Sequence, residues 1–454
     1  SDYEDNNYGS VKTDFIATQY LLALYKNDNF NRDYLDQCEI EAYKNSVFDG
    51  LIGFVHALKS LLYQRNASFS RSEAEAERAM RYYKVSKSNY GIASVHIIRG
   101  LCYFTKGQLD LAMRAYENAL SIIKTDFPDD PGFNAIINSL VAEVRYERNE
   151  IDNLATQLES TIEALESYDG WLDTFVVAYR VAVALALIQH DSENAHIIVD
   201  RAILLARERS LDDINRLAQL ERINIHIREG ALDVANDLYQ HYSDDHGSLD
   251  VIRDKQLIWR ELDNYCFTTA RLLIAQKNGH DALAALEPTV QEAHKTGRLL
   301  SLTNGHILQA RAYQVLDKQD EAIAVLRHAV TIGCSEKYLR VFLDEGEGII
   351  PILQHVIDSE RRGSTRTKLG KYCSKLMSEY RKELDGDQAT ISLTPRERQI
   401  LIGLSHGNSN KIIARDLGIT ESTIKFHLKK VYLKLGVSKR STAVIEARRQ
   451  QLLC

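Results

Sequence analysis

Residues 94–124 read SVHIIRGLCYFTKGQLDLAMRAYENALSIIK. Small and aromatic residues recur through this stretch at helical spacing: Gly100, Tyr103, Ala112, Tyr116 and Ala119. Small residues let two helices cross closely, and aromatic side chains fill the space between neighbouring pairs. Gly107 interrupts the pattern, and glycine is a strong turn signal. The stretch therefore predicts two helices joined by a turn at Gly107.

The same pattern returns along the chain. A second unit is clear near the end, with Ala310 and Tyr313, a turn at residues 317–319, and then Ala322, Leu326 and Ala329. The first close-packing alanine of each second helix recurs every 36 to 47 residues: Ala76, Ala112, Ala155, Ala195, Ala235, Ala282 and Ala322. The spacing resembles a stretched tetratricopeptide repeat, whose units have about 34 residues. We expect the pairs to stack into a superhelical solenoid with a concave surface. An irregular helical bundle, the competing architecture, gives no reason for a sustained period.

The composition agrees with an all-α protein. Only five of the 454 residues are proline, which long helices rarely tolerate. No strand and helix alternation is visible, which argues against a Rossmann or receiver domain, and Gly370-Lys371 lacks the spacing of a P-loop. The six cysteines form no CxxC pair, which argues against a zinc site or disulfides and fits a reducing compartment. Without a signal peptide or a spanning apolar stretch, we expect a cytoplasmic chain with no membrane association.

Charge is divided unevenly along the chain. Residues 391–454 contain twelve Lys and Arg against four Asp and Glu, whereas the remaining residues carry an excess of acid and bring the net charge to −7. A basic C-terminal segment on an otherwise acidic chain indicates a nucleic-acid-binding module joined to a domain of another kind.

The basic end has the pattern of a helix-turn-helix. Residues 394–397, TPRE, form a complete helix-start signal, and Gly407 ends that first helix. A short second helix is predicted at residues 410–417, Gly418 turns the chain, a third helix runs to about residue 434, and a fourth begins near Ser438. Four residues of the third helix share an apolar stripe that must face the core: Ile424, Leu428, Val431 and Leu435. The opposite side presents candidates for DNA contact: Ser422, Lys425, Phe426, Lys429 and Lys430.

Four motifs in this segment resemble the LuxR/FixJ-type helix-turn-helix: LTPRER at 393–398, NKxIA at 410–414, TIKxHL at 423–428 and KLGV at 434–437. Ile412 departs from the family, which usually has Glu there. The resemblance implies base contacts by Lys425, Phe426 and Lys429, with Ser422 added from the helical wheel. It implies DNA-backbone contacts by the following residues: Asn410, Lys411, Thr423, Lys430 and Arg440. The alternative interpretation of an isolated lysine is a solvated surface charge. For Phe426 there are two interpretations, a contact with thymine or a contact with a second subunit. In the family the fourth helix pairs two copies on DNA.

Residues 337–346, KYLRVFLDEG, have the pattern of an amphipathic helix ended by Gly346. This stretch and the late repeats at 270–333 resemble the MalT-like regulators, the large ATP-binding LuxR-type group. That group carries an ATPase domain ahead of the repeats, and this chain has none. A C-terminal fragment is favoured over a short relative, because the chain begins within the pattern and without Met. No cofactor is expected here, and ATP would act only through a preceding ATPase domain.

These features predict three regions: a repeat domain at 1–346, a basic helical linker and hinge at 347–390, and a LuxR-type DNA-binding domain at 391–454. The predicted function is sequence-specific DNA binding by a transcription regulator, an activator, whose repeats sense an inducer and control self-association on duplex DNA. Alternatively, the repeats are a docking scaffold for a regulatory protein. No catalytic constellation is visible, so no enzyme is expected, and ligand-binding residues cannot be named. The run at 240–246, QHYSDDH, is interpreted as a surface turn, and no metal site is predicted.

Overall fold

The computed structural model describes residues 49–168, 172–249, 258–361, 367–389, 395–417 and 440–449, with isolated positions at 36, 39–40, 43, 424, 427–428, 431–432 and 437. All elements within these residues are helices, so the prediction of an all-α protein is confirmed. The chain divides into two compact units, residues 1–377 and 378–454. The predicted domain boundaries at 346 and 390 stay predictions.

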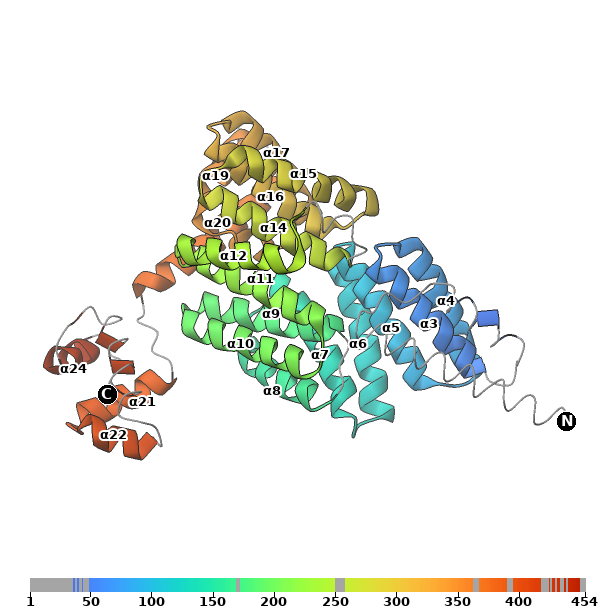
Figure 1. The fold of residues 1–454 in the computed structure, drawn as a ribbon, viewed down its shortest axis with the longest axis horizontal. Coiled ribbons are helices and arrows are strands. Elements are labelled where there is room, and N and C mark those ends of the chain that lie inside the picture. Colours follow the sequence, from blue (N-terminus) through green and yellow to red (C-terminus); the bar gives the residue numbers. More distant parts are fainter. Residues whose placement is uncertain are drawn as a thin grey trace. The chain divides into compact units, whose positions relative to one another are not determined.

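The first unit consists of helices that pack as successive pairs (Figure 1). Most partners are joined by a few residues, as the repeat pattern predicts. The pairs are α3 (Asp49–Arg65) with α4 (Phe69–Val85), α5 (Asn89–Thr105) with α6 (Leu109–Asp126), α7 (Pro131–Glu147) with α8 (Leu154–Ser167), α9 (Leu172–Ile188) with α10 (Ser192–Glu208), α11 (Asp212–Arg228) with α12 (Leu232–His246), α14 (Trp259–Ala275) with α15 (Gly279–Thr296), and α16 (Leu299–Val315) with α17 (Gln319–Glu336).

The seven alanines of the repeat pattern all lie in second helices of these pairs. Six of them are at most 1% exposed, which confirms that close helix crossings select small residues there. Ala155 is the exception, since it is only half-buried. In α8 the inward position is taken by Leu154, because the helix begins directly after Asn153, whose backbone is left-handed.

One backbone turn recurs between successive helices. The residue two positions after the end of a helix has a positive φ at the following places: Ala67, Lys87, Gly107, Asn149, His190, Ser210, Gly230, Lys277 and Asp317. At Gly107 the chain closes with hydrogen bonds from its own N–H to the Phe104 carbonyl (2.8 Å) and from Gln108 N–H to the Tyr103 carbonyl (2.8 Å). This is the usual glycine-type end of a helix.

The segment after the last repeat differs from its prediction. Residues 337–346 do not form one amphipathic helix, because α17 extends to Glu336 and only α18 (Arg340–Leu343) is helical. All four residues of α18 are buried, including Arg340 at 2% exposure. Helix α18 therefore has no solvent-facing side, and the Arg340 side chain pairs with Asp344 and Asn149.

These internal pairs join parts of the chain that are about 200 residues apart. The Leu339 N–H donates to the Glu147 carbonyl (2.8 Å) at the end of α7. The neighbouring Tyr146 hydroxyl donates to the Asp344 carboxylate (2.8 and 2.9 Å). Residues 338–345, here called the closure segment, thus link an early repeat to the end of the last one.

After the closure segment come η1 (Gly346–Ile349), α19 (Ile350–Arg361) and α20 (Lys368–Ala389). The basic linker is helical as predicted. Helix α20 continues through residue 389. The run at 240–246 also departs from its prediction: it lies within α12, with Tyr242 at 2% exposure, because tyrosine is a core residue of that pair.

The second unit contains α21 (Pro395–Ser405), α22 (Asn410–Leu417), helical positions at 424, 427–428 and 431–432, and α24 (Arg440–Arg449). Helices α21, α22 and α24 match the first, second and fourth helices that the sequence predicts, and the described positions of the third are helical. Their core includes ten buried residues: Ile400, Leu401, Leu404, Ile413, Ala414, Ile424, Leu428, Val431, Ala443 and Ala447. None of the described helices in either unit has the length and apolarity needed to cross a membrane.

We predict that Gly107→Ala lowers the thermal unfolding midpoint more than Gly230→Ala. Both glycines have a positive φ, so an alanine costs about 1–2 kcal/mol at either site. At Gly107 the added Cβ would also collide with the Tyr338 hydroxyl of the closure segment, whereas nothing lies within 4 Å of a Cβ at Gly230. Circular dichroism melting checks the order, and equal shifts would contradict the position of Tyr338.

A second prediction concerns acid stability. Burial alone would raise the pKa of Glu345, but the guanidinium groups of Arg271 and Arg311 outweigh it and lower the pKa to about 2. Because this folded pKa is depressed, the stabilisation is complete above the unfolded value of 4.5 and is lost as the pH falls towards 2. The difference corresponds to about 3 kcal/mol. Over this pH range, the free energy of unfolding measured by denaturant titration should fall more steeply for wild type than for Glu345→Gln.

The matched control is Glu347→Gln, since Glu347 is exposed two residues further on. The free energy of unfolding of Glu347→Gln should depend on pH as that of wild type does. If the free energy of unfolding of Glu345→Gln depended on pH as that of wild type does, this carboxylate would not contribute to the acid transition.

Candidate nucleic-acid interface and repeat cavity

The amino-terminal end of α22 gathers three of the residues predicted to contact the DNA backbone. Ser409 caps the helix, because its hydroxyl accepts a hydrogen bond from the Ile412 N–H (3.3 Å). Asn410 and Lys411 form the first turn, and Lys411 is exposed. From α24, Arg440 donates to the Asn410 side-chain oxygen (3.3 Å) and to the Asn408 carbonyl (2.6 Å). Free N–H groups of a first helical turn and nearby cations are the chemistry that phosphate prefers.

The core of this unit fixes which side of the third helix faces inward. Ile424, Leu428 and Val431 are at most 5% exposed, as the wheel predicts. Leu435 lies outside the described residues. So do the base contacts Ser422, Lys425, Phe426 and Lys429 and the backbone contacts Thr423 and Lys430, and all six roles stay predictions. Glu397, the last residue of the predicted helix-start signal, is buried at 2%, and Ile412 is exposed and outside the core.

Sequence reasoning missed two features of this unit. Ala443 and Ala447, one turn apart on α24, are fully buried against the other helices. Their i, i+4 spacing could have indicated an inward face. The cap by Ser409 could also have been found, since serine before a helix start is a common cap.

The first unit contains an open cavity lined by α9, α10, α11 and α14. Its walls are mainly apolar, for example Val183, Val199 and Leu217. Polar side chains also reach it, notably Arg180, Glu221 and Arg260. An apolar cavity with a few convergent polar groups is the usual form of a small-molecule site.

The two arginines that line the cavity, Arg180 and Arg260, each use only some of their hydrogen-bond donors. Arg260 is 8% exposed, and its Nη1 lies 3.5 Å from Glu143 Oε1. Its Nε and Nη2 atoms are buried without a hydrogen-bond partner in the described part of the chain. Arg180 donates to Glu143 (3.0 Å) and Glu147 (3.3 Å), and burial raises the pKa of Glu147 to about 7. Unused buried donors are costly unless something else accepts from them.

Known proteins share both parts of this architecture. The family model described as the MalT-like TPR region matches residues 51–359, more than two thirds of the chain. The chain belongs to this family. The model described as bacterial regulatory proteins, luxR family, matches residues 391–447. The resemblances found in the sequence are thereby confirmed.

Among curated relatives, the HTH-type transcriptional regulator AlkS of Ectopseudomonas oleovorans is 22% identical over 87% of the chain, and MalT of Serratia proteamaculans is 21% identical over 90%. The chain spans less than half the length of these relatives, 44% and 45%. Both are transcription regulators rather than enzymes, as expected for this chain.

Solved structures share the fold of the repeats. A Rap protein complexed with competence and sporulation factor has a TM-score of 0.52 at 13% identity, and covers 83% of this chain and 99% of its own. NprR in complex with its cognate peptide NprX has a TM-score of 0.50 at 15% identity, over 82% of this chain and 98% of its own. The predicted tetratricopeptide-like solenoid is thereby confirmed.

We predict that Lys411→Ala and Lys429→Ala change the affinity for DNA in different ways. Lys411→Ala should weaken binding to all duplexes alike and reduce the slope of log affinity against log salt by about one, as expected for a phosphate contact. Lys429→Ala should cost about 1–3 kcal/mol on the preferred site and relax the sequence preference. Fluorescence anisotropy with a duplex selected from a random library, and with a scrambled duplex, measures both.

The control is Lys295→Ala, which removes an exposed lysine of α15 in the repeat unit and should leave both affinities unchanged. If Lys429→Ala instead weakened both duplexes equally, that residue would be a phosphate contact. No change for either lysine would contradict the interface.

Proposed function

We propose that this chain is the effector-sensing and DNA-binding part of a transcription regulator, in which a ligand in the repeat cavity controls self-association on DNA. One observation carries the proposal: a luxR-type module follows a repeat unit whose cavity holds buried, unused arginine donors. The module supplies binding to duplex DNA, and the cavity supplies a place where an effector can act. No cofactor is proposed for these residues, and nucleotide control by ATP would require a further domain.

The cavity favours a particular kind of effector. Its apolar walls suit a compact hydrocarbon body, because burial of apolar surface is favourable. The free Nε and Nη2 of Arg260 suit a hydrogen-bond acceptor, best a carboxylate, which can accept from both atoms. We therefore propose a small molecule with an apolar body and an anionic or acceptor-rich end.

Self-association is the proposed link between the two parts. A luxR-type module contacts few base pairs, so two copies on adjacent half-sites would bind more tightly than one. An effector can favour the paired state only by binding it more tightly than the single state. The regulator would then activate transcription when the effector is present.

A second candidate function is a docking scaffold for a partner protein. It is favoured by large apolar side chains exposed on second helices, with Ile197 at 57% and Leu204 at 58% on α10 and Val234 at 46% on α12. The two solved structures of similar fold were determined with a peptide or a factor bound, which suits an extended partner equally well. On this alternative, the cavity would stay empty during regulation.

The test fills the cavity without touching its charges. Ala218 lines the cavity and is half-buried, so Ala218→Leu should exclude the effector and leave folding intact. A panel of small monocarboxylates, sugars and apolar amides is screened by thermal shift on the wild type. At a ligand concentration of 100 times Kd, a bound compound stabilises the protein by about 2.7 kcal/mol. That stabilisation should be absent from Ala218→Leu.

Ala155→Leu is the matched control, because Ala155 is equally half-buried on α8 but does not line the cavity. It should respond to the compound as wild type does. The same compound should change the affinity of wild type for duplex DNA, measured by anisotropy. If the panel shifts nothing and a partner protein alters DNA binding through Ile197 and Leu204, the scaffold replaces the sensor.

A further inference from the structure

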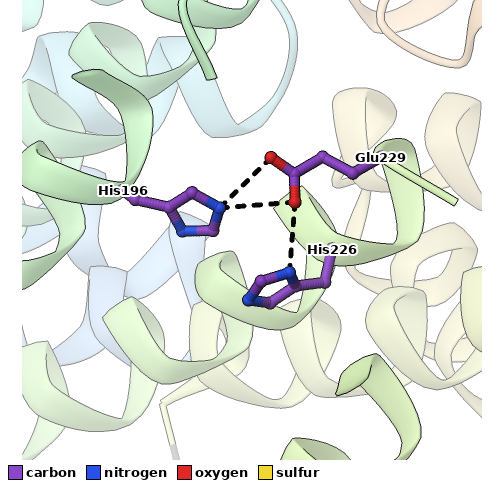
Figure 2. Close-up of side chains that lie close together, drawn as sticks. All are labelled: His196, His226 and Glu229. Carbon is purple, nitrogen blue, oxygen red and sulfur yellow. Dashed lines mark hydrogen bonds and ion pairs between the residues drawn. The ribbon is translucent and has the colours of Figure 1, made fainter. Parts of the chain in front are cut away.

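Two histidines and a glutamate converge between neighbouring helical pairs (Figure 2). His196 lies in the second turn of α10, His226 in the last turn of α11, and Glu229 directly follows α11. The Glu229 carboxylate contacts one nitrogen of each imidazole ring, and the ring centroids are 4.7 Å apart. Because 33 residues separate His196 from Glu229, the sequence shows no motif here.

The distances among these atoms suit ligands of one metal ion. His196 Nε2 lies 3.2 and 3.4 Å from the two oxygens of Glu229, and His226 Nδ1 lies 3.1 Å from Oε2. One atom from each of the three residues can be chosen so that all lie within 4.8 Å of one another. In a tetrahedral zinc site with bonds of about 2.0–2.1 Å, neighbouring ligand atoms are about 3.3 Å apart. The three donors therefore need only small side-chain movements to share an ion.

The surroundings suit binding from solution. Side-chain exposures of 20–28% let a hydrated ion reach the donors while the helices hold them. The Ser192 hydroxyl donates to Glu229 Oε1, which orients the carboxylate in the way that ligand carboxylates are commonly oriented. Imidazole with a single carboxylate favours zinc and its neighbours in the transition series over magnesium or calcium, which prefer oxygen ligands.

We propose that His196, His226 and Glu229 form a binding site for a divalent transition metal ion of the zinc type. The ion would take one donor from each residue and complete its coordination with water. The proposal departs from the sequence prediction of no metal site, which considered only donors that are close in sequence. It does not depend on the proposed function.

The site would fasten one helical pair to the next. His196 belongs to the α9–α10 pair, and the other two donors belong to the α11–α12 pair. The same two helices line the cavity, with Val199 one turn from His196 on α10 and Leu217 on α11. A bound ion would therefore stabilise this part of the repeat unit and hold one wall of the cavity.

The experiment uses the full chain, freed of any histidine tag and treated with a chelator. Isothermal titration with Zn²⁺ should give about one ion per chain, and Co²⁺ should give visible absorption of a low-symmetry site. His196→Gln and Glu229→Gln should each weaken zinc binding at least about tenfold, because loss of a ligand exceeds the effect of losing its orienting partner. Zinc should raise the melting temperature of wild type and not that of the two variants.

The control is His241→Gln, since His241 is an exposed histidine of α12 that bonds the Asp237 carbonyl and lies outside the cluster. It should bind zinc as wild type does. If the wild type binds no tighter than the double variant His196→Gln and Glu229→Gln, the cluster is only a hydrogen-bonded contact and the proposal is wrong. Circular dichroism of each variant establishes that it is folded.

Discussion

The repeat unit depends on the burial of the closure segment, residues 338–345. In a simple solenoid each repeat contacts only its neighbours, and stability is a sum of local terms. Here the Leu339 N–H bonds the end of α7, and Arg271 and Arg311, from two late helices, both bind Glu345 at 2.6 to 2.9 Å. Early and late repeats are therefore held by one buried strip of chain. Loosening that strip would affect repeats that are far apart in the sequence.

Much of this architecture follows from local patterns. Alanine spacing identifies the helical pairs, because a close crossing excludes larger side chains, and six of the seven alanines are buried. The stripe of Ile424, Leu428 and Val431 fixes the inward side of a helix for the same reason. The DNA-binding module is the most predictable part, since its helix starts, turns and core occur within 60 residues. Its predicted base contacts lie outside the described residues.

The features that the sequence does not reveal depend on packing between segments that are far apart along the chain. Seven of the repeated positive-φ turns are occupied by residues other than glycine, such as Lys87 and His190, because the packing of a helical pair outweighs their local strain. The residues 337–346 have the periodicity of a surface helix, yet residues 338–343 are buried, because α18 packs against α7 and α16. The cluster of His196 with Glu229 arises only when two pairs stack.

Two arginines of the cavity and the closure segment all form hydrogen bonds to α7, and this gives the proposed sensing a physical route. Arg180 and Arg260 reach the cavity, and their partners Glu143 and Glu147 lie on that helix. The carbonyl of Glu147 in turn accepts the hydrogen bond of the closure segment. An effector that accepts from the Nε and Nη2 of Arg260 would place an anion or acceptor on the guanidinium that Glu143 already contacts through Nη1, and so change the charge balance around α7. A buried ion network has few alternative arrangements, so such a change is passed to its neighbours rather than absorbed.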